Sequence, residues 1–193
     1  MGADRPSSLE NAVYNFPLTV RSTAKSDPIE EEVMALFDSL RNPLLRYGLS
    51  LGLPVYDAEE VIQEVFLALF RHLQLGRSRR NLRAWLFRVT HNLALKQRLA
   101  NRNSLQRTAG DASVAEQFSD PAPDPEQQVS AAQRRSRLQA VMAALPQIDQ
   151  HCLRLRAEGL RYREIAAVLE ISLGAVSISL TRSFARLTRA DGR

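Results

Sequence analysis

Apolar residues recur along most of the chain with the spacing that places them on one face of a helix. The first such run lies at 30–40, and the clearest one has apolar residues at positions 58, 61, 62, 65, 66, 69 and 73. Asp57 precedes this second run, and Glu60 lies three residues after Asp57, which is the spacing of a capping box. The pattern therefore predicts two amphipathic helices, the second of them capped by Asp57.

A further helix is predicted after the polar segment 76–80, which is rich in arginine and ends the second run. Asn81 is a suitable N-cap for it. Its expected core face consists of Leu82, Leu86, Val89 and Leu93. Because no stretch of the chain alternates as a strand does, we expect a small helical bundle.

The C-terminal part contains a helix that ends at Pro146 and a second one that ends at Gly159. The pattern that follows is typical of a helix-turn-helix, with helices at 162–169 and 173–180 separated by the turn 170–172. An ordinary helical hairpin is the alternative. The helix-turn-helix is favoured because its small, apolar and capping positions agree, at Ala166, Ile171, Ser172, Val176 and Leu180.

Composition shifts divide the chain. We expect an all-α protein with a disordered arm at 1–27, a helical domain at 28–106, an acidic proline-containing linker at 107–128 and a helix-turn-helix domain at 129–193.

Charge is distributed unevenly between these segments. Residues 71–107 carry ten basic side chains and no acidic one, whereas residues 27–70 carry nine acidic and two basic side chains. Residues 134–193 are again basic, with eleven basic and five acidic side chains. An acid-free basic block inside an ordered region indicates a polyanionic partner such as nucleic acid, and chance clustering is the alternative.

Other chemistry is poorly represented. The single cysteine, Cys152, excludes an internal disulfide and a cysteine-cluster zinc site, and the three histidines lie far apart. We expect His91 on a helix surface and Cys152 as a small buried residue. Because no signal peptide, apolar span, phosphate loop or nucleophile motif is present, we expect a cytoplasmic protein with no catalytic site, cofactor or metal.

Two blocks of sequence resemble the extracytoplasmic-function (ECF) group of the sigma-70 family of bacterial RNA polymerase sigma factors. Residues 57–66 (DAEEVIQEVF) and 81–94 (NLRAWLFRVTHNLA) resemble the family's region two, and residues 145–187 resemble region four. The two blocks span about two thirds of the chain, in the family's order. The resemblance implies a transcription initiation factor that binds core RNA polymerase, promoter DNA and an anti-sigma factor.

The resemblance also implies roles for individual residues. In the family the acidic helix of region two docks on the β′ clamp helices, and region four meets the β flap. The residues matched to the polymerase-binding helix are Asp57, Glu60, Gln63 and Glu64. A solvated helix face is the alternative for them. The residues matched to recognition and melting of the minus-ten promoter element are Arg77, Arg79, Arg80, Arg83, Arg88, Asn92 and Lys96. For Trp85 we favour packing over base stacking.

Region four departs from the family in its recognition helix. The residues expected at the minus-thirty-five element are Arg161, Arg163, Ala175, Ser177, Ile178, Ser179, Thr181 and Arg182. The usual cations are replaced by Ser177, Ser179 and Phe184, whereas Arg182 keeps its charge, and Glu170 stands where the family has glycine. Nearby arginines, Arg186 among them, are expected to compensate.

Three alternatives remain beside a sigma factor. A helix-turn-helix regulator that acts without polymerase would leave residues 57–98 unexplained. A degenerate sigma-like protein would bind polymerase or an anti-sigma factor but would read promoters poorly, in keeping with the altered recognition helix. An enzyme is disfavoured because the chain has no combination of catalytic residues.

Overall fold

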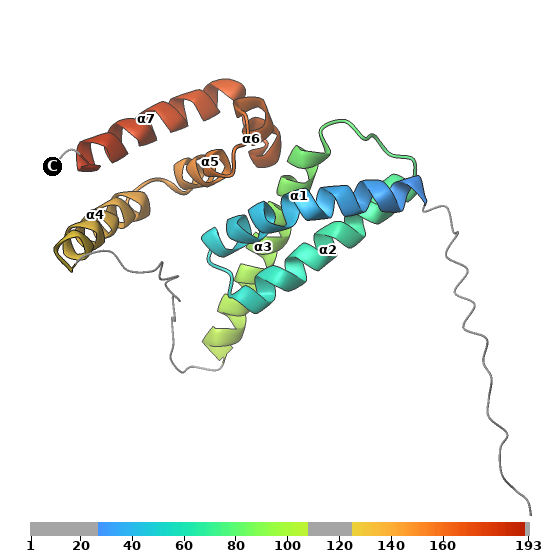
Figure 1. Cartoon of the computed structure of the whole chain (residues 1–193), viewed down its shortest axis with the longest axis horizontal. Helices are drawn as coiled ribbons and strands as arrows, with labels where there is room; N and C mark the ends of the chain where they lie inside the picture. Colours follow the sequence, from blue (N-terminus) through green and yellow to red (C-terminus); the bar gives the residue numbers. More distant parts are fainter. Residues whose placement is uncertain (1–26, 108–124, 192–193) are drawn as a thin grey trace, which may run out of the picture.

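The computed structural model describes residues 27–107 and 125–191, in which every regular element is an α-helix (Figure 1). Residues 1–26, most of the predicted arm, and 108–124, most of the predicted linker, lie outside the described residues. Side chains at 105–107 and 125–130 are also not described. The described elements form one group of three helices and one of four.

The first group consists of α1 (Pro28–Ser50), α2 (Val55–Gln74) and α3 (Leu82–Arg107). Asp27 caps α1 by accepting a hydrogen bond of 2.9 Å from the backbone N–H of Ile29. All seven apolar positions predicted for the second run are buried in the core of this bundle. Its largest fully buried side chains include Tyr47 of α1 and Phe87 of α3. The sequence period therefore identified the core face of α2 correctly.

The predicted cap of α2 is wrong by almost one turn, because the N-cap lies three residues before Asp57. The helix begins at Val55, with Pro54 in the N-cap position and no side-chain cap. The carbonyl of Pro54 already accepts a hydrogen bond from the N–H of Ala58, so Asp57 lies inside the first turn. Its carboxylate instead accepts a 2.5 Å hydrogen bond from the side-chain amide of Asn101. Asp57 thus links the start of α2 to the C-terminal part of α3 instead of capping a helix.

The second group consists of α4 (Pro125–Ala143), α5 (Gln147–Ala157), α6 (Tyr162–Leu169) and α7 (Leu173–Asp191). α4 begins within the segment predicted as linker. The helix-turn-helix is formed by α6 and α7, and Val176 is fully buried in it. Ser172 caps α7 as predicted, accepting a 3.1 Å hydrogen bond from the N–H of Ala175. Glu170 ends α6 with a positive φ of 55°, the left-handed conformation that favours glycine.

The two groups are in contact, because α6 packs on α3 and α5 meets α1. This contact overturns the expected position of His91, which is only 8% exposed. Its Nδ1 lies 2.8 Å from the hydroxyl of Tyr47, and its ring lies 4.9 Å from the ring of His151 in α5. The prediction failed because the apolar spacing along α3 identifies only the face that packs within its own bundle. The face of α3 that is covered by the other domain has no apolar spacing of its own in the sequence.

In the part of the chain that the structure describes, no single helix has the length and apolar character needed to span a membrane. Taken together, α6 and α7 pass the same test, and they are bent by 109°.

Candidate polymerase and DNA interface

Three of the four residues expected to bind polymerase share the outer face of α2. Glu60, Gln63 and Glu64 are exposed and lie within one turn of each other. Asp57 is half-buried at the start of the helix and is engaged by Asn101. The open acidic face therefore consists of Glu60, Gln63 and Glu64, with Asp57 as a structural anchor at its end.

Two exposed apolar residues extend the same face. Tyr56 is 71% exposed and Leu67 is 58% exposed, at positions that continue the helical spacing of Glu60, Gln63 and Glu64. A hydrogen bond to Glu60 raises the pKa of the Tyr56 hydroxyl. Sequence reasoning missed both residues because it searched this face for charge alone. We name Tyr56, Glu60, Gln63, Glu64 and Leu67 the α2 outer face.

The residues predicted to contact the minus-ten element lie in the loop before α3 and on α3, and they fall into two classes. Arg77, Arg79 and Arg80 are exposed in the loop before α3, and Arg79 pairs with Glu32 of α1 at 2.9 Å. Asn92 and Lys96 are exposed on α3, one turn apart. These five side chains lie at the surface, where they can meet a polyanion.

Arg83 and Arg88 of α3 contact the helix-turn-helix group instead. The Arg83 side chain is half-buried and donates a 2.7 Å hydrogen bond to the backbone carbonyl of Glu158. Arg88 lies 3.9 Å from the carboxylate of Glu170. Trp85, between them, is half-buried against the core with its ring 4.7 Å from that of His72, which confirms packing for this residue.

On α7 the predicted DNA-binding residues separate into exposed and inward-facing ones. Ala175, Ser177 and Thr181 are exposed, and Ile178 is 66% exposed. Ser179 is only 4% exposed, so this residue does not share the open face of the helix. The helical period explains the difference, because position 179 lies one turn after buried Val176.

Ser179 and Arg182 both bind a buried carboxylate, that of Asp149 in α5. Asp149 is completely buried, and its Oδ1 accepts a 2.8 Å hydrogen bond from the hydroxyl of Ser179. The guanidinium of Arg182 donates to both carboxylate oxygens at 2.7–3.1 Å. This Asp149 network fixes α7 against α5. Sequence reasoning missed Asp149, because an aspartate in the first turn of a helix is ordinarily a solvated residue that favours the helix dipole.

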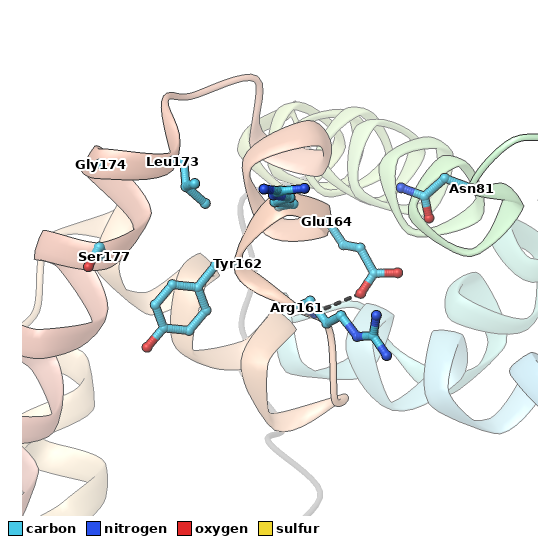
Figure 2. A pocket seen from close by; sticks show the side chains of 8 residues that line it. Asn81, Arg161, Tyr162, Glu164, Leu173, Gly174 and Ser177 are labelled. Atoms are coloured by element: carbon cyan, nitrogen blue, oxygen red, sulfur yellow. Dashed lines mark hydrogen bonds between the residues drawn. The ribbon is translucent and has the colours of Figure 1, made fainter.

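A groove of about 780 Å³ opens beside the helix-turn-helix. Figure 2 shows that its lining comes from Asn81 before α3, from Arg161, Tyr162 and Glu164 at the start of α6, and from Leu173, Gly174 and Ser177 of α7. Arg163 also lines it. Both predicted arginines of α6 are exposed here, next to Ser177.

The rim of the groove combines charge with an aromatic ring. The N–H of Arg161 donates a 2.7 Å hydrogen bond to Glu164, which completes the first turn of α6. The guanidinium of Arg156 stacks over the Tyr162 ring, 5.8 Å from its centre. The exposed side chains of Arg161 and Arg163, beside the polar start of α6, form a surface that suits a phosphate backbone.

Comparison with known proteins agrees with this arrangement. Residues 36–104 match the family model "Sigma-70 region 2", and residues 135–187 match "Sigma-70, region 4". The first segment lies in the α1–α3 group and the second in the α4–α7 group.

Individual relatives are similar over most of the chain. RNA polymerase sigma factor CnrH of Cupriavidus metallidurans is 31% identical over 148 residues, which cover 72% of this chain and 75% of that protein. The ECF RNA polymerase sigma-E factor of Escherichia coli is 27% identical over 136 residues, with 67% and 71% of the two chains covered. Among solved structures, the sigma factor RpoE of Bartonella quintana, in complex with the anti-sigma factor NepR, superposes with a TM-score of 0.59 at 20% identity. That match covers 83% of this chain and 94% of the other, and it shows a shared fold. The chain belongs to the sigma-70 family of RNA polymerase sigma factors, in its extracytoplasmic-function group.

Proposed function

We propose that this protein directs core RNA polymerase to a set of promoters, using the α2 outer face to bind the enzyme and the two helical domains to bind DNA. The observation that carries the proposal is the presence of both sigma domains, in order, with an exposed acidic face on α2 of the first. The protein itself catalyses no reaction in this proposal. Its place of action is the cytoplasm, where bacterial polymerase works.

The α2 outer face suits a basic partner with apolar side chains. Glu60 and Glu64 supply charge that accelerates encounter and fixes register, and Leu67 and Tyr56 supply apolar area at its ends. The matching partner surface is the clamp helices of the β′ subunit. Region four has the β flap as its expected partner on the same enzyme.

Polymerase binding can be tested on this face alone. We expect Glu60→Lys and Glu64→Lys to weaken binding to core polymerase in a pull-down, and Leu67→Ala to weaken it at unchanged charge. Asp38→Lys is a matched control, because Asp38 is an exposed carboxylate on a different helix, α1. Unchanged binding by the Glu60 and Glu64 variants, with normal helicity, would reject the assignment.

Two surfaces are proposed for promoter DNA. The exposed residues Asn92 and Lys96, with the loop arginines Arg77, Arg79 and Arg80, contact the opened minus-ten element, and Arg83 and Arg88 join them once their contacts with region four are released. Phosphates are held by the cations, and an amide such as that of Asn92 can read a base edge.

The groove beside α6 and α7 contacts the minus-thirty-five element. Its proposed contacts are Arg161, Arg163, Ala175, Ser177, Ile178 and Thr181. Ser179 and Arg182 act there indirectly, because their hydrogen bonds to Asp149 hold the recognition helix in place. Ile178, which is exposed, can meet a thymine methyl group.

The decisive experiment is run-off transcription with core polymerase and genomic templates from the organism that encodes the protein. We expect specific initiation only when this protein and core enzyme are both present. Tight, specific binding to duplex promoters without polymerase would favour an ordinary regulator. Polymerase binding without initiation on any template would favour a degenerate sigma-like protein.

An anti-sigma factor is the remaining proposed partner. Its support is the fold shared with the Bartonella quintana protein, which was solved with such a partner. Co-purification of the protein with the product of a neighbouring gene would test this assignment.

A further inference from the structure

One exposed face of α7 carries methyl groups and no charged or amide group. Positions 174, 178, 181 and 185 follow the spacing of a single helix face, and position 175 lies one turn before 178. All five residues are exposed, and Ile178 is 66% exposed. We name them the α7 open face: Gly174, Ala175, Ile178, Thr181 and Ala185.

Arginines flank this face. The Nε and one terminal nitrogen of Arg182 donate to the carboxylate of buried Asp149 at 2.7–3.1 Å, so this edge of the guanidinium is occupied. Arg186 is exposed further along α7, and Arg161 and Arg163 line the groove beside the start of the helix. Cations at the flanks suit phosphates, which leaves the uncharged face between them for base edges.

The side chains of the α7 open face distinguish between bases by their chemistry. In the major groove, guanine is read by Arg or Lys, adenine by Asn or Gln, and cytosine by Asp or Glu. The α7 open face contains none of these residue types. Thymine presents a C5-methyl group, which apolar side chains and the methyl group of threonine contact. The α7 open face therefore matches thymine.

Gly174 indicates that a partner approaches this face closely. Glycine in a helix is less favourable than alanine, so the fold benefits from it only where a side chain would clash. A Cβ built on Gly174 would have the Ser172 hydroxyl, 3.9 Å away, as its nearest contact beyond the helix's own backbone and the adjacent residues. Alanine would therefore fit within the folded chain. The missing side chain leaves room for DNA next to Ile178.

We infer that α7 identifies the minus-thirty-five element by the C5-methyl groups of two neighbouring T·A base pairs, with Ile178 and Thr181 as specificity-determining residues. This role rests on the proposed binding of that element by region four. Three residues of a helix rise about 4.5 Å, close to the roughly 3.4 Å between base pairs, so the two side chains meet adjacent pairs. Both lie in the N-terminal half of α7, the part of a recognition helix that contacts base edges.

The methyl groups can be removed from the DNA without changing its base pairing. The probe is duplex DNA selected from a random library by the full-length protein, once with core polymerase and once without it. Each thymine of the selected upstream element is then replaced by deoxyuridine, which keeps the hydrogen bonds of the base pair and lacks only the methyl group.

We expect two neighbouring base pairs at which deoxyuridine lowers affinity about threefold to fourfold, the effect of burying one methyl group. Competition binding measures this penalty. Deoxyuridine placed in the spacer downstream of the element is the DNA control and should leave affinity unchanged.

Two variants assign the methyl contacts to residues. Ile178→Ala shortens the side chain, and Thr181→Ser removes one methyl group while the hydroxyl remains. Each should weaken binding to the thymine probe and abolish the deoxyuridine penalty at one base pair, a different one for each variant. Thr188→Ser is the matched control, because Thr188 is exposed on the same helix about two turns beyond Thr181, and it should keep both penalties. Thermal unfolding verifies that all three variants fold normally.

Any of three results would overturn this role of α7: selected DNA without neighbouring T·A pairs upstream, deoxyuridine without effect at every thymine of the element, or a penalty that both variants retain. Failure of the proposed function is a separate outcome. It would be seen as the absence of run-off initiation with core polymerase on templates that carry the selected element.

Discussion

The two DNA-binding domains differ in how they use the polar residues of their recognition helices. In region two, Asn92 and Lys96 of α3 stand exposed in solvent, and Arg83 and Arg88 are held by another domain. In region four, Ser179 and Arg182 of α7 bind Asp149, which belongs to the same domain. Polar residues of α3 thus face solvent or the other domain, whereas Ser179 and Arg182 of α7 pack within their own domain.

This difference indicates where affinity for DNA arises. A side chain that already neutralises a buried carboxylate has little capacity left for a phosphate, because leaving the carboxylate unpaired is costly. The cations of region four that line the groove lie at the start of α6, in Arg161 and Arg163, and Arg186 is exposed further along α7. We therefore expect region two to contribute more of the charge-dependent affinity, with region four contributing shape and the α6 arginines.

The largest effect is expected when the buried carboxylate of Asp149 is removed. Asp149→Ala leaves Ser179 without its partner and Arg182 without its counter-ion, so we expect a loss of about 3 kcal/mol in the free energy of unfolding. Asp191→Ala is the control, since Asp191 forms an exposed pair with Arg134 at 2.6 Å, and its loss should cost much less than that of Asp149. Denaturant unfolding measures both. Equal losses would mean that Arg182 is not held by Asp149 and is available to DNA.

A second test uses the contact between the domains. Burial, with help from His91, Arg154 and Arg98, lowers the pKa of His151 from 6.5 to about 4. Tyr47 also faces this cluster through His91. Above pH 6.5 the histidine is neutral in both forms, and the contact is at full strength. Between pH 6.5 and about 4 the separated form takes up a proton that the closed form does not, so closure weakens as pH falls.

The size of this effect can be checked by energy transfer between dyes on cysteines introduced at exposed Ala35 of α1 and exposed Thr188 of α7, since native Cys152 is buried. A shift from 6.5 to about 4 lowers the ratio of closed to open molecules by up to about twentyfold between pH 7 and 5. His151→Leu should remove most of this acid dependence. His72→Leu should keep it, because His72 packs on Trp85 within region two. An acid dependence that survives His151→Leu would assign it to other groups.

A third test compares single DNA contacts in the two domains. Asn92→Ala is expected to lower promoter opening about tenfold and to relax base preference, whereas Lys96→Ala should reduce the salt dependence of binding by about one phosphate contact. Arg182→Ala should leave the salt dependence nearly unchanged, because its charge is neutralised by Asp149. Permanganate reactivity of unpaired thymines reports opening, and binding titrations over a salt series report the slope. A slope lowered equally by Arg182→Ala would remove the distinction between the two helices.

Helices, core faces and the family were predictable from the sequence because each depends on local period and spacing. The buried face of α2 and the cap at Ser172 are of this kind. The burial of Asp149 and His91 was not predictable, because it depends on which helix lies opposite. The start of α2 was misplaced because Asp57 has the chemistry of a cap, whereas the backbone at Pro54 decides where the helix begins.

The smallest expected effect concerns the turn of the helix-turn-helix, where Glu170 has a left-handed backbone. This conformation costs a residue with a side chain about 1 kcal/mol more than glycine, so Glu170→Gly should stabilise region four by about 0.5–1 kcal/mol. The substitution also removes the contact with Arg88, but a 3.9 Å pair with both partners exposed contributes little. Glu170→Ala separates the two terms, because alanine loses the same ion pair and keeps the backbone strain. Thermal unfolding should therefore rank glycine above glutamate, with alanine no more stable than glutamate. Equal stability of the glycine and alanine variants would show that the turn relaxes out of the left-handed region, and the departure from the family at this position would then be explained by the contact with Arg88 alone.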